Sequence, residues 1–228
     1  MSPSDNFKTV LIAGATGNIG RACVKYASEN IKWIPTLVSR DNLNLANWNR
    51  VMDFAERSST GPFDLVIMAH GTQTLCTLSN MTKFIWEEII KNNLSSSAAL
   101  ITALIKNKKI NPGALIVFIS SIQATQPRAG RGAYAAAKAG IEGLMRATAV
   151  ELFDINARAI ALRIAQMTEP MKGIKFTPDE ILKINKIMPL GLVNPSSIAK
   201  LIFETYYNQP FITGEVIEIS AGHNLNIW

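Results

Sequence analysis

Residues 114–121 read ALIVFISS and, after a loop, residues 134–152 read YAAAKAGIEGLMRATAVEL. The first stretch begins with an unbroken apolar run, which is typical of a strand buried on both faces. The second is alanine-rich with helical spacing, so Tyr134 and Lys138 would lie one turn apart on one face. Ser121 ends the strand thirteen residues before Tyr134. A hydroxyl, a phenol and an ammonium group can therefore converge on one point.

This triplet suits the interconversion of a carbonyl group and an alcohol. A phenol titrates near pH 10, and an adjacent lysine is expected to lower that pKa by stabilising the phenolate. Tyr134 could then protonate a carbonyl or deprotonate an alcohol, while Ser121 holds the same oxygen. The hydride would come from a cofactor. A Tyr-x-x-x-Lys pair by itself is more often an exposed helix face, so its context decides the interpretation.

The N-terminal region supplies that context. Residues 9–13 (TVLIA) predict a buried strand, residues 14–20 (GATGNIG) follow directly, and a helical pattern comes next. Strand, glycine turn and helix form the setting of a dinucleotide-binding fingerprint, in which backbone N–H groups approach the pyrophosphate. The candidate contacts are Gly14, Thr16, Gly17, Asn18, Ile19 and Gly20.

A second predicted strand, residues 34–38, ends in Ser39 and Arg40. In a dinucleotide-binding fold this end meets the adenosine ribose, where arginine favours the 2′-phosphate of NADP and a carboxylate favours the hydroxyl of NAD. These two residues therefore predict NADP(H) over NAD(H). The alternative is an ordinary arginine in an exposed turn. Beyond them, residues 44–45 could form a very short strand, with little room for a full crossover helix.

Residues 63–69 predict another buried strand that ends at His70 and Gly71. His70 could be a base, but a packed loop histidine is the more common case. Residues 82–106 predict a long helix that contains Asn93, a polar residue that needs partners. Asn93 could hold a water or a backbone carbonyl near Lys138.

The remaining elements predict one domain with a lid. Residues 111–113 (NPG) predict a turn before the strand at residues 114–121. After the Tyr134 helix, a strand, a helix and a strand are predicted at residues 157–164, 197–207 and 214–219. Residues 166–194 resemble a substrate-binding insert. Its apolar residues could contact a fairly hydrophobic substrate, pack the insert on the body or form a subunit interface: Met167, Met171, Ile174, Phe176, Ile181, Leu182, Ile184 and Met188.

Composition narrows the class further. At 228 residues, one domain with a sizeable core is expected. Two cysteines and no secretory signal favour a reduced, cytoplasmic location. Apolar residues 10–15 are too few to span a membrane. The net charge of +6 comes from dispersed residues, so neither nucleic acid nor a membrane is expected as a partner. No metal site is expected.

Taken together, these motifs resemble the short-chain dehydrogenase/reductase family over nearly the whole chain. The resemblance is carried by GATGNIG, KNNLSSSAALITA, ISS, YAAAK, MPLGL and ITGEVIEISAG. It implies a Rossmann-type, doubly wound α/β fold with a mostly parallel seven-stranded sheet. It also implies a catalytic tetrad of Asn93, Ser121, Tyr134 and Lys138, in which Lys138 binds the nicotinamide ribose and Asn93 supports a relay water. A homotetramer or homodimer is implied as well.

The chain departs from the family pattern at several positions. The spacing Gly14, Gly17, Gly20 is that of the longer, sugar-nucleotide-modifying branch, although 228 residues leave no room for that branch's C-terminal region. MAHG replaces the usual NNAG, the Pro-Gly expected near residues 162–165 is missing, and SAG replaces DGG near the C-terminus. Three further cofactor contacts are carried over: Ala69, Gly71 and Thr168.

The resulting prediction is an NADP(H)-dependent oxidoreductase that acts on a small-molecule carbonyl or secondary alcohol. MPLGL resembles a segment of 3-oxoacyl-carrier-protein reductases, which makes that substrate class a candidate. Two alternatives are a nucleotide-binding sensor or scaffold without turnover and a sugar-nucleotide epimerase or dehydratase.

Overall fold

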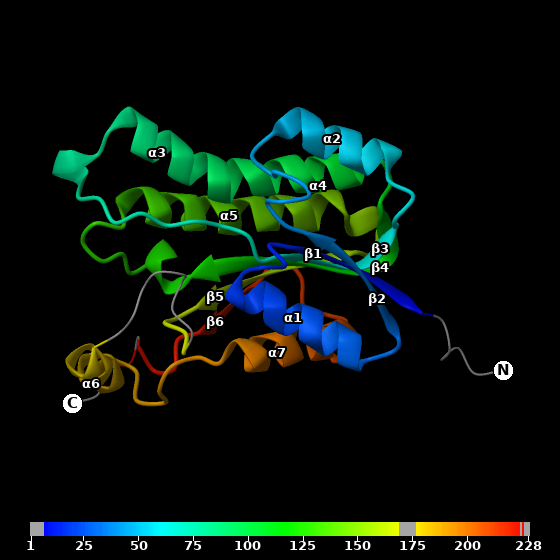
Figure 1. Cartoon of the computed structure of the whole chain (residues 1–228). Helices are drawn as coiled ribbons and strands as arrows, with labels where there is room; N and C mark the ends of the chain where they lie inside the picture. Colours follow the sequence, from blue (N-terminus) through cyan, green and yellow to red (C-terminus); the bar gives the residue numbers. More distant parts are fainter. Residues whose placement is uncertain (1–6, 169–176, 224, 226–228) are drawn as a thin grey trace.

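The computed structural model describes residues 7–168, 177–223 and 225, and its centre is a parallel sheet (Figure 1). Six strands lie in the order β2-β1-β3-β4-β5-β6. Their bounds are Lys8–Ala13 (β1), Trp33–Val38 (β2), Phe63–Met68 (β3), Ile110–Ser121 (β4), Arg158–Ile164 (β5) and Val216–Ile219 (β6). The strand order reverses between β1 and β3, and ligands bind at such a switch point, beyond the carboxyl ends of the strands.

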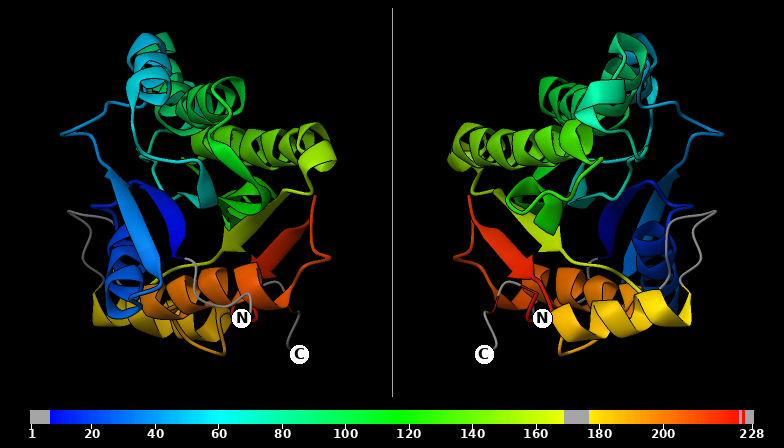
Figure 2. Two further views of the ribbon diagram at one scale, coloured as in Figure 1. Left: turned by 90° about the vertical axis from the view of Figure 1, so that its right-hand side faces the viewer. Right: turned by 90° about the vertical axis from the view of Figure 1, so that its left-hand side faces the viewer.

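Helices cover both faces of the sheet, as the two end views also show (Figure 2). In Figure 1, α2, α3, α4 and α5 lie above the sheet, whereas α1 and α7 lie below it. Their bounds are Asn18–Glu29 (α1), Trp48–Arg57 (α2), Lys83–Ile90 (α3), Ser96–Lys106 (α4), Gly132–Glu151 (α5), Pro178–Ile187 (α6) and Pro195–Asn208 (α7). A π-helical turn, Lys91–Ser95, joins α3 to α4. The predicted long helix is therefore present, with a local irregularity at Asn93.

Each face of the sheet has its own hydrophobic core. Successive side chains of a strand point to opposite faces, so Leu11 enters one core and Ile12 enters the other. Val66 and Ile67 on β3 divide in the same way. Because both faces are covered, β3 is apolar at nearly every position and buried throughout. This explains why unbroken apolar runs predicted the central strands correctly.

The fold class is confirmed, but the described sheet has six strands where the family resemblance implied seven. Residues 39–47 pass from β2 to α2 through consecutive turns, and the short strand predicted at residues 44–45 is absent. Leu43 and Leu45 are buried against the core and anchor this connection. Nine residues are too few for a crossover helix and another parallel strand, since such a connection alone needs a dozen residues.

A second correction concerns residues 111–113, which were predicted as a turn. They lie inside β4, where the pairing shifts: Ile110 is opposite Phe63, and regular pairing resumes with Leu115 opposite Leu65. Gly113 adopts φ +74°, a conformation that glycine tolerates and other residues rarely do. The NPG segment therefore forms a bulge in the strand.

The predicted lid is only partly within the described residues. Ile184 and Met188 are buried in the core beneath the sheet, which supports the packing interpretation for these two. Ile181 and Leu182 are exposed. Met171, Ile174 and Phe176 lie outside the described residues. Whether this segment closes over a substrate stays a prediction. Within the part of the chain that the structure describes, no helix has the length and hydropathy needed to cross a bilayer.

Candidate active site

The loops after β1, β3 and β4 meet at the carboxyl edge of the sheet and form a cleft of about 710 Å³. It is lined by residues from the glycine turn, the loop after β3 and the first turns of α5. Those predicted from the sequence are Thr16, Gly17, Asn18, Ile19, Ala69, Gly71, Asn93, Tyr134 and Lys138. The structure therefore brings the two halves of the predicted site, which are more than 100 residues apart in sequence, to one place.

The glycine turn packs tightly against the loop after β3. Gly14 has φ +84°, and a Cβ atom there would lie 2.6 Å from the backbone nitrogen of His70. The N-cap of α1 is Gly17, whose lack of a side chain leaves the first turn without a side-chain cap. First-turn N–H groups have no partner within a helix and attract anions. This N-terminus, facing the cleft, fits the pyrophosphate of a dinucleotide.

The loop after β2, where the adenosine ribose is expected to bind, carries a positive charge on Arg40 and a negative charge on Asp41. Ser39 and Arg40 do not line the main cleft; they line an adjoining cavity of about 60 Å³ with Gly14, His70 and Gly71. Asp41 lines the main cleft and was not singled out from the sequence. Its signal was its position directly after the strand-end arginine, where a carboxylate favours NAD.

Tyr134 and Lys138 lie on consecutive turns of α5, as their spacing predicted. The ammonium of Lys138 is 5.5 Å from the centre of the Tyr134 ring and donates a hydrogen bond of 2.8 Å to the carbonyl of Ile119. Burial lowers the pKa of Lys138 to about 8. A hydrogen bond between Tyr134 and Ser121 is one of two influences that lower the phenol pKa.

The net effect on Tyr134 differs from the sequence expectation. Burial raises the pKa of the phenol, and this outweighs the lowering by Ser121 and by the positive charge of Arg131. The expected lowering of the phenol pKa by Lys138 is thus absent from the protein alone. The structure instead identifies Arg131 as the charge acting on Tyr134, and sequence reasoning missed it.

The two serines that end β4 have different surroundings. Ser120 is buried and donates a 2.8 Å hydrogen bond to Glu142, which also binds the guanidinium of Arg163 at 2.7 Å. Both serines line the smaller pocket beside Tyr134, but Ser121 is the one hydrogen-bonded to the phenol. Ser120 therefore belongs to a structural network, and Ser121 is the serine available at the site.

Asn93 lies in the π-helical turn, completely buried. Its amide nitrogen donates 2.8 Å hydrogen bonds to the carbonyls of Thr72 and Ile89. Its amide oxygen has no hydrogen-bond partner among the described residues. A Cβ atom on Gly71 would lie 2.5 Å from that oxygen and 3.6 Å from the ammonium of Lys138. Asn93 is therefore beside Lys138 with a buried acceptor unused.

His70 is held as a packed loop residue, the interpretation that the sequence favoured. Its Nε2 atom is hydrogen-bonded to Ser96 at 3.0 Å and to Ser97 at 3.2 Å. Burial, then the charge of Lys138, lower its pKa to about 3, so the ring is neutral at physiological pH.

The segment that replaces the family's Pro-Gly now has a definite register, because Ile164 is opposite Ser121. Met167 follows and lines the main cleft. Thr168, the predicted nicotinamide contact, is exposed and donates its backbone N–H to Val193, and it does not line the cleft. Gly20 does not line the cleft either; it is buried in the first turn of α1, packed against the carbonyl of Gly14.

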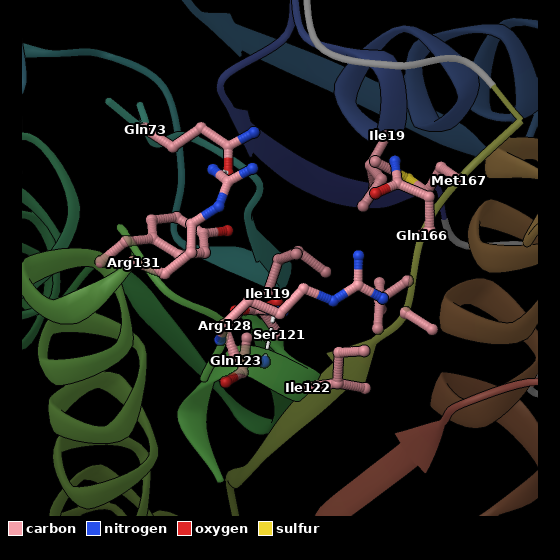
Figure 3. A pocket seen from close by; sticks show the side chains of 14 residues that line it. Ile19, Gln73, Ile119, Ser121, Ile122, Gln123, Arg128, Arg131, Gln166 and Met167 are labelled. Atoms are coloured by element: carbon pink, nitrogen blue, oxygen red, sulfur yellow. Dashed lines mark hydrogen bonds between the residues drawn. The ribbon is translucent and has the colours of Figure 1, made fainter. Parts of the chain in front are cut away.

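A smaller pocket of about 160 Å³ lies beside the main cleft and shares Ile19, Ile119, Tyr134 and Met167 with it. Figure 3 shows Gln73 and Arg131 pointing toward one another at one side of this pocket, with Arg128 extending toward the opposite side. A guanidinium nitrogen of Arg131 donates a hydrogen bond to the amide oxygen of Gln73. Tyr134 therefore lines both the main cleft and the smaller pocket.

Comparison with known proteins agrees with this geometry. Residues 14–224 match the family described as enoyl-(acyl carrier protein) reductase. The chain is 30% identical over 222 residues to a 3-oxoacyl-(acyl-carrier-protein) reductase of Chlamydia trachomatis, covering 93% of this chain and 86% of that protein.

Two solved structures share the fold over nearly their full lengths. One is the ligand-free aldohexose dehydrogenase of Thermoplasma acidophilum, with a TM-score of 0.85, 19% identity, and 97% and 96% coverage of the two chains. The other is a small-chain dehydrogenase in complex with NADPH, with a TM-score of 0.82, 20% identity, and 96% and 99% coverage. The chain belongs to the short-chain dehydrogenase/reductase family of NAD(P)-dependent oxidoreductases.

Proposed function

We propose that the protein interconverts a carbonyl group and a secondary alcohol with NADP(H). One observation carries the proposal: Ser121, Tyr134 and Lys138 converge where the glycine-turn cleft meets the smaller pocket. The cleft is suited to the dinucleotide and the pocket to the substrate. A substrate carbonyl at this junction would be within reach of the dinucleotide in the cleft and of the three side chains.

In this proposal each side chain has one task. The bound dinucleotide supplies or accepts the hydride at the substrate carbon. Tyr134 donates a proton to the carbonyl oxygen, or removes it from the alcohol. Ser121 hydrogen-bonds the same oxygen and holds it near the phenol. Lys138 binds the cofactor ribose hydroxyls.

Asn93 completes the proposed set as a positioning residue. Its unused buried oxygen beside Lys138 is the feature that supports this role, because buried polar atoms without partners are rare. A water bound there could return protons from solvent to Lys138 and Tyr134.

The preference for NADP(H) rests on Arg40 and Ser39 at the end of β2. A guanidinium can bind a phosphate through two parallel N–H···O bonds. The solved relative with NADPH offers support at the level of the fold. Asp41 is the opposing feature, because a carboxylate at this place would repel the 2′-phosphate.

The identity of the curated relative favours 3-oxoacyl compounds as the first substrates to test. The MPLGL segment, residues 188–192, pointed to the same class. We also propose a dimer or tetramer, which is supported by exposed apolar residues on α3 and at the C-terminal end of α5: Phe84, Trp86, Val150 and Phe153. Light scattering on the purified protein would test this.

The decisive experiment compares the protein with its Tyr134→Phe variant. Wild type should quench tryptophan fluorescence on binding NADPH and oxidise NADPH when a carbonyl substrate is added. The variant keeps the ring, so NADPH binding should be unchanged, while turnover should fall by about 100-fold or more because the general acid is lost. Equal turnover by both proteins would refute the role of Tyr134.

A further inference from the structure

We infer that the small pocket binds a carboxylate, so that the substrate is an oxo acid whose charged group is held by Arg131 and Arg128. This inference rests on the proposed reduction of a carbonyl at Tyr134. It concerns the residues between Ser121 and Tyr134, which neither the sequence motifs nor the comparisons assign to any role.

The first argument is the charge of the pocket. Two of its lining residues are arginines, and none of the lining residues is acidic. The two guanidinium groups are close enough for the charge of Arg128 to lower the pKa of Arg131. Among the described residues, neither forms an ion pair with a carboxylate. An anion bound between the two guanidinium groups would relieve their mutual repulsion.

The other partly buried arginines of the described chain are satisfied differently. Arg163 is paired with Glu142 at 2.7 Å and with Glu218 at 2.9 Å. Arg158 donates to the backbone carbonyls of Gln209 and Tyr206. Arg131 is half-buried, and its described side-chain partner is the neutral amide of Gln73. Among the described residues Arg131 therefore has no carboxylate partner, and where Arg158 has two backbone carbonyls, Arg131 has one neutral amide.

The second argument is that Arg131 is held in place. Its position is fixed at one end by the first turn of α5, three residues before Tyr134, and at the other by Gln73 from the loop after β3. Holding the guanidinium in advance reduces the entropy lost on binding. Its planar fork matches the two oxygens of a carboxylate. Arg128 is exposed, with His223 3.4 Å from its guanidinium, so it contributes a more flexible second charge.

The third argument is size. The pocket of about 160 Å³ must hold both the reacting carbonyl and the group that the arginines bind. A carboxylate a few bonds from the carbonyl fits this space. A neutral 3-oxoacyl thioester would offer neither guanidinium group an anionic partner. The geometry thus separates an oxo acid from the thioester suggested by the curated relative.

The test is a comparison of matched substrates. Short oxo acids with the carbonyl at position 2, 3 or 4 are assayed with NADPH beside their methyl esters, a neutral 3-oxoacyl thioester and a phosphorylated ketone. We expect at least one acid to exceed its ester in kcat/KM by about 10- to 100-fold, the contribution of a charge-assisted hydrogen bond. A preference for the thioester or the phosphorylated ketone would overturn the assignment of a carboxylate.

Variants then locate the preference. Arg131→Gln should abolish the preference for the acid, mainly by raising KM for the acid, and should change the kinetics of the ester far less. Arg131→Lys should restore part of the preference. Arg128→Gln should reduce it roughly two- to fivefold, as for an exposed pair. Arg50→Gln, on the exposed surface of α2, is the matched control and should have no effect. If Arg131→Gln slows acid and ester equally, in protein that melts like wild type, the inference is wrong.

Failure of this inference and failure of the proposed function are distinguishable. Turnover of esters without any acid preference would leave the oxidoreductase intact and remove the carboxylate site. If no carbonyl is reduced, calorimetric titration of a saturated acid into the NADPH-loaded protein decides the matter. If the wild-type protein binds the acid and Arg131→Gln does not, the carboxylate site is supported even though no reaction was found. If the wild-type protein does not bind the acid, the carboxylate site is refuted.

Discussion

Gly14 is the position where a single methyl group should damage both the fold and the cofactor cleft. Its φ of +84° is in the left-handed region, and the added Cβ of Gly14→Ala would lie 2.6 Å from the His70 nitrogen and 2.7 Å from the Ala69 carbonyl carbon. These atoms belong to backbone, which cannot rotate away as the end of a side chain can. The turn after β1 and the loop after β3 would have to separate.

The expected loss follows from two contributions. An alanine in the left-handed region costs about 1–2 kcal/mol, and forcing a methyl into a packed site costs about 1–3 kcal/mol more. The sum is about 2–5 kcal/mol in the free energy of unfolding. For a protein of this size, Tm should therefore fall by about 4–20 °C.

Gly113→Ala is the matched control, because Gly113 has φ +74° but nothing within 4 Å of the added Cβ. It should lose only the conformational part, about 1–2 kcal/mol. Any change in the entropy of the unfolded chain is shared by the two variants and cancels in their difference. Urea unfolding measures both, and NADPH titration should show weakened binding for Gly14→Ala alone. If Gly14→Ala is no less stable than Gly113→Ala, the close contact between the two loops is not real.

The other predictions concern the cofactor and the buried charge network. Arg40→Asp should weaken NADPH by about 10- to 100-fold and leave NADH nearly unchanged; an equal effect on both dinucleotides, measured by fluorescence titration, would show that Arg40 does not bind the 2′-phosphate. Glu142→Gln should cost about 3 kcal/mol in urea unfolding, because Arg163 loses its more buried partner but keeps Glu218. Arg163 and Ser120 hold the pKa of Glu142 below its usual value although burial opposes them, so this stability is present above the ordinary pKa and is lost as pH falls through the lowered one. The variant should lack this acid-side slope; an unchanged slope would exclude Glu142 as its source.

The elements of the fold could be predicted wherever burial made the pattern simple. Largely continuous apolar runs placed β1, β3 and β4, because strands covered on both faces contain few polar residues. The predictions of the strand number and of the NPG turn were wrong, because the local sequence pattern does not show how strands pair. The number of strands depended on whether residues 39–47 contain a strand, and turn hydrogen bonds anchored by Leu43 and Leu45 prevented one. The NPG segment looked like a turn, and only pairing with β3 made it a bulge.

The reactive groups could be predicted from spacing, and their surroundings could not. Tyr134 and Lys138 share a helix face by period alone, and Ser121 follows from the end of β4. Ser120 was distinguished from Ser121 only by Glu142, twenty-two residues away in the chain. The pKa of Tyr134 depends on burial and on Arg131, so reasoning from the Tyr–Lys pair alone had the wrong sign.

By itself the sequence determined the order of the elements, the glycine turn before α1 and the alignment of Tyr134 with Lys138. These features depend on interactions between residues a few positions apart in the chain, so the spacing of residue types in the sequence predicts them. Only the tertiary structure decided that Gln73 meets Arg131, that Asp41 rather than Arg40 lines the main cleft and that Thr168 lies outside it. Such contacts join loops from separate strands, and the packing of the whole sheet sets their distances.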